Sequence, residues 1–164
     1  MDQNCKTLIW NQMGAAIDSL GKAIDHTPDE HWTDDTEYHQ IWYMAFHTIF
    51  WLDYYLSIPT EEFAPPAPFT MSEMDPSGII PDPAYTKEQL KTYLAYCREK
   101  TKNLILNLTE EQAGYLCHTS KVDIRLDEML LYSMRHTQHH TAQIHLLLRQ
   151  RIDSAPRWTF RAEE

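Results

Sequence analysis

Residues 41–56 read IWYMAFHTIFWLDYYL, and this stretch decides the fold. Apolar residues stand on almost every side of a helix drawn through it, and a helix that is apolar all round is buried among other elements. Its 16 residues fall short of the ~20 that a membrane span needs, and they include His47 and Asp53. The stretch therefore predicts a helix inside a protein, with no membrane contact, and other helices must surround it.

Three further segments have helical spacing. Apolar residues recur at three- and four-residue steps over about 3–25 and again over about 125–151. The third segment begins with a capping-box pattern, Thr86 followed by Gln89, and ends near Asn107. With the central helix placed at about 37–57, we expect four long helices and no β-strands.

The connections between these helices differ in length and composition. Residues 58–85 hold seven of the nine prolines, so no long helix survives there, and a connection of this length can join two parallel helices. The other links are short or moderate. We therefore predict an all-α fold, a four-helix bundle of up-down-down-up topology with a long Pro-rich crossover between the second and third helices. Residues 1–164 form one domain, and a tail from about 152 docks Trp158 and Phe160 onto the body.

Charge and cysteine content exclude several classes of protein. Because 24 acidic residues oppose 14 basic ones, the formal charge of -10 repels a phosphate backbone, and we expect no nucleic-acid partner. The three cysteines show no C-x-x-C spacing, which argues against a disulfide framework or a thiolate zinc site. The first residues lack the pattern of a secretory signal, so we expect a cytoplasmic protein.

Histidines carry the main chemical signal. His136 and His140 stand four residues apart, so they share one face of the last helix about 6 Å apart along its axis. His47 interrupts the apolar helix that should face it. Three imidazoles can bind a divalent cation and leave one coordination position for water or substrate. We predict His47, His136 and His140 as metal ligands.

The neighbours of these ligands are assigned by helical angle. In the last helix, residues 129, 133, 136, 140, 143 and 147 follow 4-3-4-3-4 steps, which predicts an inward-facing row that holds both ligands. Gln143 and His139 are candidates to support the ligands from behind. His139 and His145 point toward the rim or solvent. Asp53 is expected on a solvated face or beside an arginine.

Less specific interpretations of the same residues stay open. A histidine on an apolar face is more often a hydrogen-bonded core residue than a ligand, and an i,i+4 histidine pair alone is nonspecific. The aromatic residues of the second helix fit the core and dimer contacts, and Cys97 fits a buried inert thiol. Three hypotheses follow: a metal-dependent enzyme acting on a small molecule, a noncatalytic metal-binding stress-response or interaction module, and a metal-free helical bundle.

Two segments resemble the DinB/YfiT superfamily of four-helix-bundle proteins, whose last helix carries a motif of the type H-x-x-H-H-R-G-Q and whose second helix supplies another histidine. The first segment is HTQHHTAQ at 136–143, where Thr141 and Ala142 replace the frequent Arg-Gly pair, and the second is AFHTIFW at 45–51. The resemblance implies the ligands His47, His136 and His140, a zinc or nickel ion, and a homodimer. In some members it also implies transfer or isomerisation that involves a low-molecular-weight thiol such as bacillithiol or mycothiol. We therefore expect a metal-dependent transferase or hydrolase.

Overall fold

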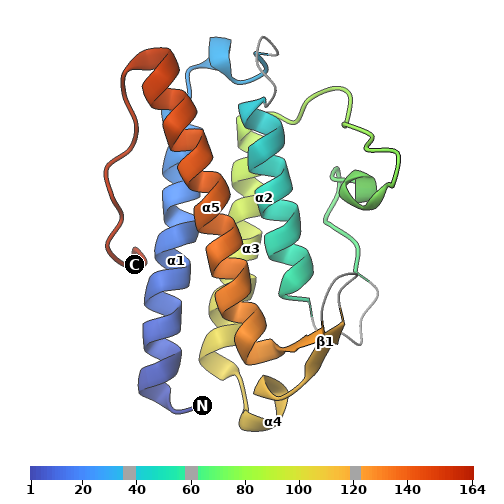
Figure 1. Cartoon of the computed structure of the whole chain (residues 1–164), viewed down its shortest axis with the longest axis vertical. Coiled ribbons are helices and arrows are strands. Elements are labelled where there is room, and N and C mark those ends of the chain that lie inside the picture. Colours follow the sequence, from blue (N-terminus) through green and yellow to red (C-terminus); the bar gives the residue numbers. More distant parts are fainter. Residues whose placement is uncertain (35–39, 58–62, 119–122) are drawn as a thin grey trace.

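Four long helices lie side by side in the computed structural model, which describes residues 1–34, 40–57, 63–118 and 123–164 (Figure 1). They are α1 (Gln3–His26), α2 (Ile41–Tyr55), α3 (Lys87–Asn107) and α5 (Leu126–Ile152). Both α1 and α2 contact α3 and α5 extensively, whereas α1 and α2 barely touch each other. In Figure 1, α1 and α5 run toward one end of the molecule and α2 and α3 run the opposite way. The prediction of a mostly helical protein is confirmed.

Short elements complete the described chain. They are η1 (Asp29–His31), η2 (Met71–Met74), α4 (Glu110–Ala113), β1 (Leu116–His118) and β2 (Asp123–Arg125). The two strands pair in antiparallel fashion, with Cys117 opposite Ile124. The expectation of no strands was wrong, because three residues are too few for an alternating pattern to be recognised. None of the helices in the described ranges has both the length and the apolar character that a membrane span requires.

Local capping explains where the helices begin and end. The Asp2 side chain accepts a hydrogen bond from the Cys5 backbone N–H at 2.8 Å, and this caps α1. The predicted capping box of α3 is present, with Thr86 and Gln89 bonding to each other's backbone N–H groups. The predicted start of α2 at about residue 37 falls within 35–39, outside the described residues.

The core of the bundle includes one buried carboxylate that sequence reasoning misplaced. Asp53 on α2 is only 2% exposed, so the expected solvated face is wrong. Its carboxylate accepts hydrogen bonds from the Tyr93 hydroxyl at 2.8 Å and from the Lys100 ammonium at 2.6 Å. The partner is therefore a lysine and a tyrosine of α3 rather than an arginine, and the group ties α2 to α3.

The Pro-rich connection is held against the bundle by an aromatic anchor. Phe69 is buried, and its ring lies 4.4 Å from Tyr93 and 4.7 Å from Tyr85, measured between ring centroids. Residues 58–62 lie outside the described chain. The following residues carry η2 past the outer side of α2, where Figure 1 shows this short helix beside the bundle. The connection therefore covers one side of α2.

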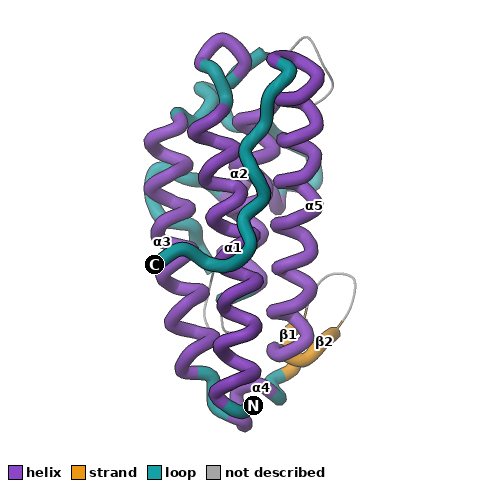
Figure 2. Tube along the Cα trace, turned by 90° about the vertical axis from the view of Figure 1, so that its left-hand side faces the viewer, coloured by secondary structure: helices purple, strands orange, loops and turns teal. Residues whose placement is uncertain are grey.

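The C-terminal tail returns along α1 (Figure 2). Asp153, in the left-handed conformation with φ 54°, ends α5, and Glu163 then donates its backbone N–H to the Asp18 carboxylate at 2.7 Å. Trp158 and Phe160 were expected to dock onto the body, but they are 66% and 82% exposed. That expectation was wrong, because backbone and polar contacts rather than these two rings hold the tail.

Asp53→Ala should destabilise the fold by about 3 kcal/mol, because it leaves the buried Tyr93 hydroxyl without its acceptor and the partly buried Lys100 ammonium without its carboxylate. Urea unfolding of the two proteins measures the difference. Asp25→Ala is the matched control, since its pair with Lys91 is solvent-exposed and should contribute far less. Equal losses for the two variants would show that the buried carboxylate has no special role.

Candidate metal centre

Three imidazoles meet between α2 and α5. One ring nitrogen from each of His47, His136 and His140 lies within 4.8 Å of the other two. The ring centroids are 5.3 Å apart for His47 and His136, 4.7 Å for His47 and His140, and 4.5 Å for His136 and His140. All three side chains are half-buried. The structure thus brings together the three residues that the sequence singled out, and we call them the histidine centre.

The histidine centre lies on the flank of α5, not on its innermost face. The buried positions of α5 include Ser133, Thr137, Thr141, Ile144 and Leu148, whereas Gln143 is exposed. The row predicted through 136, 140 and 143 is therefore wrong, by roughly 70° of rotation at 100° per residue. Threonine looks polar in a sequence pattern, but the Thr141 hydroxyl donates to the Thr137 carbonyl at 2.8 Å and so tolerates burial.

Glu73 of η2 supports His47 from the side of the Pro-rich connection. Its Oε2 atom lies 2.6 Å from His47 Nδ1 and accepts a hydrogen bond from Trp51 Nε1 at 2.9 Å, and the Tyr43 hydroxyl interacts with the same carboxylate. The Glu73 side chain is 4% exposed. With the His47 proton on Nδ1, this contact leaves the Nε2 lone pair for a cation, an arrangement common behind metal-bound histidines.

The charge of Glu73 is set by these contacts. Burial by itself raises the pKa of Glu73, but hydrogen bonds from His47, Tyr43 and Trp51 outweigh it and hold this pKa below its usual value. The same contact and burial raise the pKa of Tyr43 to about 12, so its hydroxyl remains a donor. Glu73 is therefore an anion at neutral pH.

Sequence reasoning did not find Glu73, although a signal existed. Tyr43, His47 and Trp51 stand at i, i+4 and i+8, so one face of an otherwise apolar helix presents three hydrogen-bond donors. Such a row requires an acceptor. The acceptor itself could not be chosen, because a Pro-rich connection has no periodicity that fixes where its side chains point.

The other histidines of α5 have different surroundings. His140 Nδ1 lies 2.7 Å from the amide oxygen of Gln143, so Gln143 can hold the His140 ring as predicted from its spacing. His139 is exposed, with its ring edge-on to His140 at 5.0 Å between centroids. His145 is half-buried and lies beside the backbone of Ser19 on α1, away from the histidine centre.

The donor set fits a divalent cation. Burial, followed by the neighbouring rings of His140 and His47, lowers the pKa of His136 to about 3, and burial also lowers that of His140. Both imidazoles are therefore neutral at pH 7, the form that binds a metal. Among the described residues, His136 Nδ1 is buried and finds no hydrogen-bond partner. A bound cation would accept the lone pair of such an unsatisfied nitrogen on a neutral, oriented ring.

The chain matches a known protein family. The family model described as the DinB family matches residues 1–159, which is nearly the whole chain. No curated protein and no solved structure matches it.

His136→Ala should remove most metal binding, because two imidazoles from different helices remain where three converged. Elemental analysis of protein loaded with Zn²⁺ or Ni²⁺ should give about one ion per chain before the change and far less after it. His118→Ala is the control, since this exposed histidine pairs with Asp123 on the β-hairpin. Full occupancy in the His136 variant would contradict the assignment.

Glu73→Ala should weaken metal affinity about 10- to 100-fold, because His47 loses the acceptor that fixes its ring. Glu73→Gln keeps an acceptor oxygen and should lose less. Competition with a chromophoric chelator measures both affinities, and melting of the metal-free proteins shows separately whether the fold has changed. Asp75→Asn, two residues further along the chain and partly exposed, is the control. Unchanged affinity in the alanine variant would remove Glu73 from this role.

Proposed function

The chain belongs to the DinB family, and we propose that it is a metal-dependent enzyme that acts on a small molecule, with zinc or nickel held by His47, His136 and His140. The single observation that carries the proposal is the approach of three imidazoles from two helices, with one ring nitrogen of each within 4.8 Å of the others. The proposed frame is the up-down-down-up bundle of one domain, whose Pro-rich crossover supplies Glu73 to His47.

Three protein ligands favour a catalytic over a purely structural site. Structural zinc sites are closed by four protein ligands, whereas catalytic sites retain a position for water or substrate. Within the described residues, the metal-binding group consists of these three histidines. A divalent cation at such a position lowers the pKa of a bound thiol or water, so it supplies a nucleophile at neutral pH.

Other side chains of the protein orient the histidine rings and enclose the site. Glu73 and Gln143 hold His47 and His140 by their Nδ1 atoms, which fixes both rings. The ring of Tyr55 stands edge-on to His136 at 5.8 Å between centroids. Burial and a hydrogen bond with Tyr132 raise the pKa of Tyr55, so its hydroxyl remains protonated and can donate to a bound substrate. We propose transfer of a small thiol to an electrophile as the reaction.

Neither of the other two hypotheses fits these contacts as well. In a metal-free bundle the histidines would satisfy one another, but the buried His136 Nδ1 has no partner in the described ranges. A noncatalytic metal site that only stabilises the bundle has no need of an open coordination position. If metal raised the stability of the protein and no reaction were found, the noncatalytic metal-binding module would be favoured over an enzyme.

Reaction of 2-mercaptoethanol with 1-chloro-2,4-dinitrobenzene tests the proposed transfer. The sulfur–carbon bond forms, the carbon–chlorine bond breaks, chloride leaves and the thiol proton goes to solvent. Metal-loaded protein should accelerate the absorbance change of the product, and His140→Ala should abolish the acceleration because one of the three ligands is lost. His118→Ala should retain it. An acceleration that survives both metal removal and His140→Ala would contradict a metal-dependent mechanism.

A further inference from the structure

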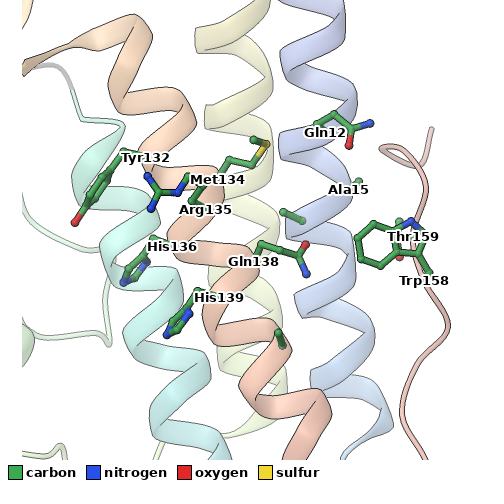
Figure 3. A pocket seen from close by; sticks show the side chains of 12 residues that line it. Gln12, Ala15, Tyr132, Met134, Arg135, His136, Gln138, His139, Trp158 and Thr159 are labelled. Atoms are coloured by element: carbon green, nitrogen blue, oxygen red, sulfur yellow. The ribbon is translucent and has the colours of Figure 1, made fainter.

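A cavity of about 640 Å³ lies beside the histidine centre (Figure 3). Side chains of α1, α5 and the C-terminal tail line it. It is within the size range of small-molecule sites. It reaches the histidine centre because His136 forms part of its wall. We call it the groove; it is lined by Gln12, Ala15, Ala16, Tyr132, Met134, Arg135, His136, Gln138, His139, Ala142, Trp158 and Thr159.

The charge of the groove is opposite to that of the chain. The protein has 24 acidic and 14 basic residues, yet the groove is lined by one arginine, Arg135, and by no carboxylate. Figure 3 shows the Arg135 guanidinium on the same side of α5 as Tyr132 and His136. The groove therefore attracts an anion toward the histidine centre.

Arg135 itself is available to a ligand. Within the part of the chain that the structure describes, it makes no ion pair and no hydrogen bond, whereas Arg98 and Arg125 are paired with Asp18 and Asp127. A guanidinium presents two parallel N–H groups that match the two oxygens of a carboxylate. An unpaired arginine in a cavity next to a metal-binding cluster is thus suited to hold an acidic group of a substrate.

The far wall of the groove offers apolar and amide contacts. Trp158 exposes most of its ring beside Ala15 of α1, and in Figure 3 the Gln138 side chain points toward the same wall. The tail that carries Trp158 is held in place, because the Ala162 N–H donates to the Asn11 carbonyl at 2.8 Å. The indole can therefore serve as a fixed surface for the apolar body of a ligand.

We propose that the groove binds the substrate of the histidine centre and that this substrate is a small monocarboxylate with an apolar body. Arg135 receives the carboxylate on the side of α5 where His136 lies, and Trp158 contacts the apolar body from the opposite wall. A single guanidinium matches one carboxylate, whereas a doubly charged phosphate group would call for more cations, and the nearby Lys22 already pairs with Glu163. The reaction of the bound molecule rests on the proposed function, but its binding does not.

The test uses 3-phenylpropionate, 3-phenylpropanol and 2-phenylethylphosphonate with the full-length protein, metal-free and zinc-loaded. Amide chemical shifts in ¹⁵N-labelled protein report the site, and titration gives each affinity. We expect 3-phenylpropionate to bind with a Kd of about 1 mM or somewhat above, at least about tenfold more tightly than the alcohol. Shifts should map to residues that line the groove, including Gln138 and Trp158.

Two variants and a control identify the contacts. Arg135→Ala should weaken 3-phenylpropionate binding about tenfold and leave the alcohol unchanged, because only the carboxylate uses the guanidinium. Trp158→Ala should weaken both compounds. Arg149→Ala, also exposed on α5 but outside the groove lining, should change neither. Circular dichroism checks that each variant is folded.

The outcomes separate this proposal from the proposed function. Carboxylate binding that persists in metal-free protein supports the groove even when zinc does not bind or no reaction is found. Equal affinity for acid and alcohol, or an Arg135→Ala variant that binds as well as the unaltered protein, overturns the groove. Tighter binding of the phosphonate than of the carboxylate overturns the monocarboxylate assignment.

Discussion

The hydrogen bonds that Glu73 accepts from one face of α2 are the constraint on which the histidine centre depends. A carboxylate that is only 4% exposed needs such donors to be stable as an anion, and His47 and Trp51 supply them at Oε2. The contact couples His47 of α2 to the Pro-rich connection, which also stacks Phe69 on Phe46 of α2. If the Pro-rich connection left α2, the carboxylate would lose its donors and His47 its orienting partner. The crossover therefore acts as part of the site as well as a link between helices.

Features that are encoded locally could be predicted from the sequence, whereas features that distant contacts decide could not. The ends of α1 and α3 follow from caps and periodicity that involve residues three or four positions apart. The histidine spacing is equally local. Asp53 was misplaced because its surroundings come from α3, and Glu73 was missed because it lies in a connection without periodicity. The angle of 100° per residue gives the directions of side chains relative to one another on one helix. Which of these directions faces the core depends on how the neighbouring helices pack.

The rotation error on α5 has a chemical consequence. Had His136 and His140 pointed at the centre of the bundle, as their apolar neighbours in the pattern suggested, they would be sealed from solvent. Thr137 and Thr141 occupy the buried face instead, and the imidazoles lie on the flank that faces α2. That position makes them dry enough to be neutral yet leaves His136 in the wall of the groove. A metal site that must meet a small molecule needs both properties.

The tail shows that the groove is a product of the fold and not of a loose chain end. Gly14 lies on α1 where a Cβ would collide with Ala162 of the tail and crowd the Trp10 ring, so a glycine there permits the close approach. The backbone hydrogen bond from the Ala162 N–H to the Asn11 carbonyl then fixes the tail against α1. Once the tail is fixed, the position of Trp158 is set relative to α5. The crossover orients His47 through Glu73, and the tail adds Trp158 to the lining of the groove. Two segments without regular periodicity therefore complete the surroundings of the ligands and of the groove, while the helices α2 and α5 carry the histidines themselves.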